Sequence, residues 1–156
     1  MGHGTDERGE IHGRKPTPCA GRRQAPCRRR IVARLDAIAA VEARGFLFAT
    51  PLALELGVGV IPVRKPGKLP ADTIEHEYDL EDGRERLQMH RNVLPAGARV
   101  LVVDDVLATG GTAAACMKLI EAGGGKVAGA AFLIEIEPLG GRERLAPHRV
   151  EATLTY

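Results

Sequence analysis

Apolar residues are spaced along the chain in two ways, and together the two spacings predict alternating strands and helices. Every position of 37–41 and of 100–103 is apolar, as expected for strands buried on both faces of a sheet. Residues 46–56 place apolar side chains three or four positions apart and are followed by Gly57, which predicts a helix. A second helix is predicted over 113–122, before a run of three glycines.

The remaining segments continue this alternation. Residues 72–90 alternate in polarity around Asp82-Gly83, which predicts two extended segments joined by a hairpin-like loop. Strands that alternate with helices indicate an α/β fold with a parallel sheet and helical cover. Further strands are predicted at 58–64, 126–137 and 150–156, a Pro/Gly turn with lysines at 65–70, and a short helix at 140–146.

Charge is distributed unevenly along the chain. The 156 residues include 22 Lys and Arg and 20 Asp and Glu, a formal net charge of +2. Residues 1–34 hold nine of the basic and three of the acidic residues, which leaves thirteen and seventeen for the rest. Because residues 1–30 are poor in apolar positions, we expect a poorly ordered basic tail over 1–34 and one domain over 35–156. A nucleic-acid-binding arm is the alternative interpretation of the tail, but no nucleic-acid partner is expected.

The sequence argues against membrane insertion, disulfide bonds and a zinc site. No apolar run approaches the roughly 18 residues that a transmembrane helix needs, and the N-terminus lacks the apolar core of a signal peptide. The three cysteines, Cys19, Cys27 and Cys116, are odd in number and lack C-x-x-C spacing. We therefore expect a cytoplasmic protein without a membrane partner, and we expect Cys116 in the core.

Two adjacent carboxylates, Asp104 and Asp105, follow the predicted strand 100–103. In open α/β sheets, ligands bind beyond the carboxyl ends of such strands, so both acids are expected to face a crevice. Carboxylate oxygens accept hydrogen bonds from hydroxyl groups, which suits the diol of a sugar. The sequence therefore predicts a sugar-binding position at this strand end.

The segment A-T-G-G-T at 108–112 then leads into the second predicted helix. A helix start offers unpaired backbone N–H groups and the positive end of the helix dipole, and two glycines let a ligand approach the backbone. Such a turn forms a cradle that fits a phosphate monoester. The alternative is a strand–turn–helix unit whose acids merely cap the helix. Neither a P-loop nor a dinucleotide-binding glycine pattern is present.

The whole stretch VLVVDDVLATGGT, residues 100–112, resembles the phosphoribosyl-pyrophosphate (PRPP) signature of type I phosphoribosyltransferases. EARGFLFATPLALELGVG at 42–59 and VRKPGKLP at 63–70 resemble the adenine phosphoribosyltransferase family, and EHEYDLEDGRERLQMH at 75–90 resembles that family's flexible catalytic loop. The resemblance runs over about 35–156. It implies the type I phosphoribosyltransferase fold, a mostly parallel twisted sheet with helices on both faces and a flexible catalytic loop.

The resemblance also implies a role for most residues of the signature. Asp104 and Asp105 would hold the ribose 2′- and 3′-hydroxyls, and Val106 would lie under the purine ring. These roles agree with the diol site and the phosphate cradle that the residues alone predict. The 5′-phosphate would be enclosed by Ala108, Thr109, Gly110, Gly111 and Thr112.

The resemblance implies that positive charge for the pyrophosphate group of PRPP would come from two other segments. Arg44 lies between the first predicted strand and helix, in a turn where the family has a cis peptide bond that does not involve proline. The Pro/Gly turn supplies Arg64, Lys65 and Lys68, and in family dimers one of these basic residues can reach the neighbouring subunit's site. An ordinary solvated basic turn is the alternative interpretation of these three residues.

The implied reaction transfers the 5-phosphoribosyl group from PRPP to adenine and gives AMP and pyrophosphate, a step of purine salvage. Its transition state resembles an oxocarbenium ion, so catalysis lies in stabilising the leaving pyrophosphate and placing the base. Arg44 and Glu81 are the expected catalytic residues, and Glu81 matches the family's acid that handles the purine proton. Mg²⁺ would bind through PRPP oxygens, without direct protein ligands. The resemblance also implies a homodimer.

Two features depart from the family pattern. Asp82 stands after Glu81, where the family commonly has an aromatic residue, although Tyr78 is in place. Residues 1–34 lack the family's Pro-Gly-containing segment that forms the hood over adenine. The main hypothesis is therefore an enzyme of this family. Two alternatives remain: an impaired enzyme that keeps the PRPP site, and a PRPP-sensing regulator of the same fold.

Overall fold

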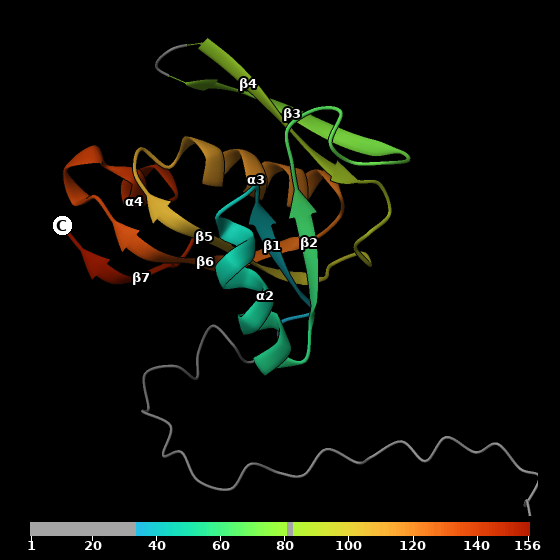
Figure 1. Cartoon of the computed structure of the whole chain (residues 1–156), viewed down its shortest axis with the longest axis horizontal. Coiled ribbons are helices and arrows are strands. Elements are labelled where there is room, and N and C mark those ends of the chain that lie inside the picture. The colour runs from blue at the N-terminus through green and yellow to red at the C-terminus, as the bar shows by residue number, and fades with distance from the viewer. Residues whose placement is uncertain (1–33, 81–82) are drawn as a thin grey trace, which may run out of the picture.

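The computed structural model describes residues 34–80 and 83–156, and at its centre is a five-stranded sheet (Figure 1). The strand order is β2-β1-β5-β6-β7, and all four pairings between neighbouring strands are parallel. The predicted α/β fold with a mostly parallel sheet is confirmed. The strands are β1 (Ala37–Val41), β2 (Gly59–Val63), β5 (Arg99–Leu107), β6 (Lys126–Glu135) and β7 (Val150–Thr155).

Helices α2 (Gly45–Leu56) and α3 (Gly111–Ala122) cover opposite faces of the sheet. Ala49 of α2 packs in a buried cluster with Ile38 and Leu101 of the sheet. The next residues along the same strands point to the other face, because side chains alternate across a strand, and there they pack with α3. Burial on both faces explains why these strands are continuous apolar runs.

Strands β3 (Thr73–Leu80) and β4 (Gly83–His90) form a separate antiparallel hairpin that lies over α3 (Figure 1). One face of the hairpin packs Leu87 and Met89 into the cluster around α3. A bridge between Arg64 and Gln88 connects the hairpin to the chain that follows β2. The two predicted extended segments are confirmed, and the two residues between them, Glu81 and Asp82, lie outside the described residues.

Two short helices, η2 (Glu137–Leu139) and α4 (Gly141–Arg144), follow β6. The sequence predicted a strand as far as residue 137, but β6 ends at Glu135 and Pro138, which has no backbone N–H group, lies in η2. Glu135 is 3% exposed, and Nε and Nη2 of Arg142 both donate to its carboxylate. Arg142 Nη1 also donates to the carbonyl oxygen of Val150 at 2.7 Å. This arginine therefore connects α4 to β6 and β7.

Three further expectations concern the tail, the membrane and the cysteines. Residues 1–33 lie outside the described residues, so the basic tail over 1–34 and the domain boundary stay predictions. Within the described part of the chain, no helix combines the length and apolar character needed to cross a membrane. Cys116 is fully buried on α3, as predicted, and burial raises the pKa of its thiol to about 12.

The ion pair between Glu135 and Arg142 can be tested by removing the cation. Arg142→Met keeps much of the side-chain volume but leaves the buried carboxylate without a charged partner. We expect the free energy of unfolding to fall by about 3 kcal/mol, because an unpaired buried charge is strongly destabilising. Arg149→Met breaks only the exposed pair with Glu151 and should cost less than about 1 kcal/mol. Urea denaturation measures both values, and equal losses would contradict a structural role for the buried pair.

Candidate active site

Most of the predicted site residues meet in a cavity of about 470 Å³ at the carboxyl ends of β1 and β5, whereas Arg64 and Lys68 do not line it and Glu81 lies outside the described residues. This is the edge at which ligands bind in open α/β sheets. Segments that are far apart in the sequence form its walls, and the stretch from the two aspartates to the start of α3 is the longest of them. The lining residues are 41–44, Lys65, Tyr78, Glu85, Leu87 and 104–113.

The two aspartates lie within β5, whereas the sequence predicted that the strand ends before them. Pairing with β1 ends at Val103, but pairing with β6 continues from Asp104 to Leu107. Beyond Val103, β5 therefore has a strand neighbour on the β6 side alone. This open flank leaves room for the β1–α2 turn to approach Asp104 and Asp105, because β1 has already ended at Val41.

The Asp104 carboxylate is packed against the start of α2. A Cβ atom on Gly45 would lie 2.9 Å from Asp104 Oδ1 and 3.0 Å from the carbonyl oxygen of Val103, so this close approach requires glycine. The backbone N–H of Asp105 donates to Asp104 Oδ1 at 2.9 Å. Burial, to which the neighbouring Asp105 adds, raises the pKa of Asp104 to about 7.

Asp105 forms an ion pair with Arg44, with 2.6 Å between Oδ2 and Nε. The Asp105 side chain is 16% exposed, whereas the Arg44 side chain is 75% exposed. Arg44 is the N-cap residue of α2 and follows a cis peptide bond between Glu42 and Ala43, the bond that the family resemblance implied. The residues predicted for ribose and for pyrophosphate thus contact each other directly.

The predicted phosphate cradle, residues 108–112, forms the turn between β5 and α3. Gly110 is the N-cap of α3 with φ of 76° and has no side chain to cap the helix, whose first turn holds no acid. The carboxylates of Asp104 and Asp105 contact the Asp105 N–H and Arg44 instead. The alternative in which the aspartates cap this helix is therefore wrong, and its first backbone N–H groups remain available to an anion. A Cβ atom on Gly110 would lie 2.8 Å from the carbonyl oxygen of Gly141. The cradle is thus packed directly on the backbone of α4.

The basic turn after β2 is held by Glu42, a residue that the sequence analysis did not single out. Glu42 Oε2 lies 2.7 Å from Arg64 Nε, and Oε1 accepts from the backbone N–H of Lys65 at 3.0 Å. Burial raises the pKa of Glu42, but these hydrogen bonds and the charge of Arg64 outweigh it, so the net direction is downward. Arg64 Nη1 donates to the carbonyl oxygen of Lys68 at 3.0 Å. Of the three basic residues predicted here, Lys65 lines the cavity.

The hairpin contributes a second acid that sequence reasoning missed, Glu85 of β4. Glu85 Oε1 lies 2.7 Å from Lys65 Nζ, and Oε2 accepts from the Tyr78 hydroxyl at 3.0 Å. The same hydroxyl lies 3.4 Å from Thr112 Oγ1 in the cradle. Glu81, the predicted proton-handling acid, lies outside the described residues, so its role stays a prediction.

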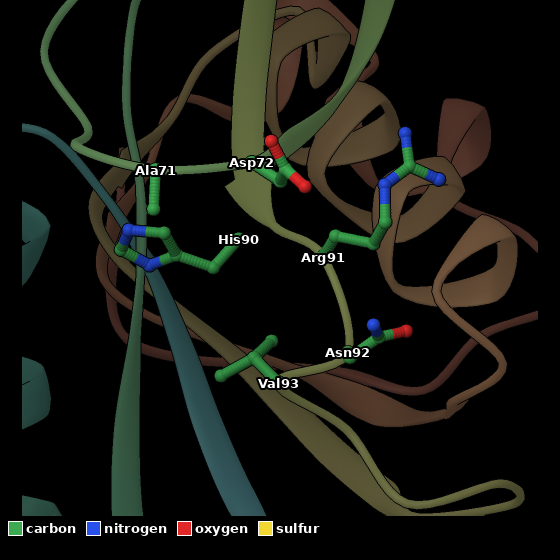
Figure 2. A pocket seen from close by; sticks show the side chains of 6 residues that line it. All are labelled: Ala71, Asp72, His90, Arg91, Asn92 and Val93. Atoms are coloured by element: carbon green, nitrogen blue, oxygen red, sulfur yellow. The ribbon is translucent and has the colours of Figure 1, made fainter.

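A second hollow of about 690 Å³ lies at the other end of the hairpin, where β3 begins and β4 ends. Figure 2 shows that the side chains around it point in different directions and do not converge on a common point. It shares no lining residue with the first cavity. The lining residues are Ala71, Asp72, His90, Arg91, Asn92 and Val93.

Metal ligands do not gather in either place. Among residues 34–80 and 83–156, no three His, Cys, Asp or Glu side chains are grouped so that they could hold a metal ion. The cavity thus combines paired carboxylates, a helix start and two cations. That arrangement fits a ligand with a sugar diol, a phosphate at one end and a second anion at the other, and defines a phosphoribosyl-transfer class of protein.

Comparison with known proteins agrees with this class. Residues 28–150 match the family model of the phosphoribosyl transferase domain. The adenine phosphoribosyltransferase of Roseiflexus sp. (strain RS-1) is 57% identical over 122 residues, which cover 78% of this chain and 71% of that protein.

Two solved structures have the same fold. Adenine phosphoribosyltransferase from Thermoanaerobacter pseudethanolicus matches with a TM-score of 0.77 and 50% identity, over 79% of this chain and 72% of that one. The Saccharomyces cerevisiae enzyme, solved with D-2,5-dideoxy-2,5-imino-altritol 1,6-bisphosphate and adenine, matches with a TM-score of 0.74 and 42% identity, over 78% and 68%. The chain belongs to the adenine phosphoribosyltransferase family.

The raised pKa of Asp104 predicts a pH-dependent stability. The folded protein keeps this proton up to about pH 7, whereas a free carboxyl group loses it near pH 4. The contribution of Asp104 to the free energy of unfolding therefore decreases as the pH rises from about 4 to about 7. Asp104→Asn removes the titration. Its stability relative to the wild type should therefore rise by about 2 kcal/mol between pH 5 and pH 8.

Urea denaturation at both pH values measures this difference. Thr50→Ser, an exposed position of α2 that carries no ionisable group, is the control and should differ from the wild type by the same amount at pH 5 and pH 8. A stability difference between Asp104→Asn and the wild type that does not change with pH would contradict the raised pKa of Asp104.

Proposed function

We propose that this chain transfers the 5-phosphoribosyl group from PRPP to adenine and gives AMP and pyrophosphate. The observation that carries the proposal is the continuous wall 104–113, which shares one cavity with Arg44 and Lys65. Adenine as the base is supported by the 57% identity to a named adenine phosphoribosyltransferase. The same identity supports an enzyme over a regulatory protein of this fold.

The ribose 5-phosphate part of PRPP is proposed to bind along β5 and the following turn. Asp105, whose carboxylate lines the cavity, and Asp104 accept hydrogen bonds from the two ribose hydroxyls. The 5′-phosphate takes the free N–H groups at the start of α3, where the helix dipole favours an anion. The turn that receives this phosphate consists of Ala108, Thr109, Gly110, Gly111 and Thr112.

Pyrophosphate is proposed to bind at another part of the cavity wall, the turns after β1 and β2. Arg44 and Lys65 line the cavity there with exposed side chains. Arg64 and Lys68 add positive charge to the same turn, and the contacts of Arg64 with Glu42 and with the Lys68 carbonyl oxygen hold that turn in place. The leaving group thus meets cations of the turns after β1 and β2, outside the segment 108–112 that receives the 5′-phosphate.

In the proposed reaction, the bond between C1′ and the pyrophosphate oxygen breaks and its electron pair leaves with pyrophosphate. A ring nitrogen of adenine forms the new bond to C1′, and Glu81 takes the proton from the purine. Cations beside the leaving oxygens stabilise their charge as it develops, which lowers the barrier. Val106, half-buried in the cavity wall next to Asp105, supports the purine ring by packing.

Mg²⁺ is proposed as the cofactor, bound mainly through oxygens of PRPP. The residues present fit this arrangement, because Asp104 and Asp105 are placed to hold the ribose hydroxyls and the phosphate oxygens of PRPP are themselves the hard ligands that Mg²⁺ takes. When bound, the ion neutralises part of the pyrophosphate charge. The cytoplasmic location and the lack of a nucleic-acid partner remain predictions from the sequence.

A homodimer is proposed, and the outer surface of α2 supports it. Leu47 and Leu54 on this helix are 71% and 79% exposed, and Phe48 is 37% exposed. Large apolar side chains grouped on one helix are typical of an interaction surface. The helix follows Arg44 directly, so a second copy seated on α2 would lie near the pyrophosphate wall.

The reaction can be tested with the purified chain, PRPP and Mg²⁺. We expect spectrophotometric assays to detect AMP formation from adenine and no product from hypoxanthine or guanine. Calorimetric binding of PRPP without AMP formation would contradict turnover and support an impaired enzyme that keeps the PRPP site.

The diol role of Asp105 predicts a loss of PRPP affinity in Asp105→Asn. The amide keeps one acceptor but loses the charge, and hydrogen bonds to charged groups contribute enough that we expect affinity to fall about 10-fold or more. Isothermal titration with PRPP measures the change. Asp79→Asn, which alters an exposed hairpin acid paired with Arg84, is the matched control and should bind PRPP as the wild type does. Unchanged affinity in Asp105→Asn would contradict the diol role.

A further inference from the structure

The β3–β4 hairpin has two faces of different character. Directly opposite residues of an antiparallel pair share a face, so Glu85 points to the same side as its partner Tyr78. On this inner face, Leu87 and Met89 of β4 are buried in the core. The basic residues of β4, such as Arg84, lie on the outer face and pair with exposed acids of β3. Glu85 is therefore a carboxylate in a row that otherwise faces the core and the cavity.

Both oxygens of Glu85 are occupied by groups that face the cavity. Oε1 pairs with Lys65 Nζ at 2.7 Å, and Oε2 accepts from the Tyr78 hydroxyl at 3.0 Å. The ion pair lowers the pKa of Glu85 and raises that of Lys65. The Lys65 cation is thus already neutralised by a partner that belongs to the protein.

The backbone and the side chain of Lys65 are held in different ways. Glu42 fixes the backbone N–H of Lys65, and the side chain of Glu42 is 13% exposed. The Lys65 side chain is 55% exposed and Glu85 is 34% exposed, so water can replace either partner of this second pair. The turn can therefore stay in place while Lys65 Nζ moves from one anion to another.

We propose that Glu85 sets the affinity of the site for pyrophosphate by holding Lys65 until the anion takes it over. The inference rests on the proposed function, in which Lys65 binds pyrophosphate. Glu85 is a positioning residue, because it acts through Lys65 and does not touch the leaving group. Pyrophosphate must compete with Glu85 for this cation, so its binding is weaker than the exposed charges alone would give, and its release is correspondingly easier.

Glu85→Gln tests the inference because glutamine keeps an acceptor for the Tyr78 hydroxyl but no longer holds Lys65 by charge. Calorimetric titration with pyrophosphate in the presence of Mg²⁺ should show about 2- to 5-fold tighter binding, the range that loss of a competing exposed ion pair gives. In the assay, KM for PRPP should fall by a similar factor without a rise in kcat. If Glu85 only stabilised the fold, Glu85→Gln would lower neither the Kd for pyrophosphate nor the KM for PRPP.

Two further variants separate this effect from a general change of charge. Glu77→Gln removes an acid of the same hairpin that pairs with Arg84 on the outer face, and it should leave pyrophosphate binding unchanged. In a Lys65→Met background, Glu85→Gln should have no effect, because the cation that it releases is gone.

The outcomes also separate the inference from the proposed function. Pyrophosphate affinity that Glu85→Gln leaves unchanged or weakens would overturn the inference alone. The same would follow if the affinity gain persisted in the Lys65→Met background. A wild-type chain that binds no pyrophosphate would overturn both the proposed function and the inference.

Discussion

A half-buried carboxylate, that of Asp104, is the constraint around which the site is arranged. It lies near the carboxyl end of the central strand β5, where the neighbouring strand β1 has ended and pairing continues on the β6 side. The start of α2 fills the open flank, and it fits because Gly45 has no side chain to meet Asp104 Oδ1. The backbone of Asp105 donates to the same oxygen, and its own carboxylate reaches Arg44. Asp104 and Asp105 thus connect the proposed ribose side of the cavity to its pyrophosphate side.

The phosphate cradle depends on a second backbone contact, between Gly110 and Gly141. Both residues must be glycine, since a Cβ atom on either would lie less than 3 Å from a carbonyl oxygen of the other segment. Gly141 begins α4, and the next residue, Arg142, is held by the buried Glu135 at the end of β6. An ion pair that touches no proposed ligand therefore fixes the element on which the cradle rests. The C-terminal elements of the chain belong to the binding site in this mechanical sense.

Local sequence predicted most of the fold and the segment 104–112 of the candidate site, because both depend on short continuous runs of residues. Runs such as 100–103 define buried strands, and 104–112 is one segment whose residues stay neighbours in space. The acids Glu42 and Glu85 were missed because their partners lie 22 and 20 residues away, and only the folded chain brings them together. The extent of β5 was missed because aspartates rarely continue a strand, and here pairing with β6 allows it.

Amide hydrogen exchange with and without PRPP tests the central claim most directly, because it locates the ligand without requiring turnover. Exchange should slow at residues 109–113, whose N–H groups surround the start of α3, and at 44–47 around the start of α2. Residues 71–73 and 90–93, beside the second hollow, should exchange as before. Protection at that hollow in place of the turns after β1 and β5 would contradict the account, as would unchanged exchange at saturating PRPP.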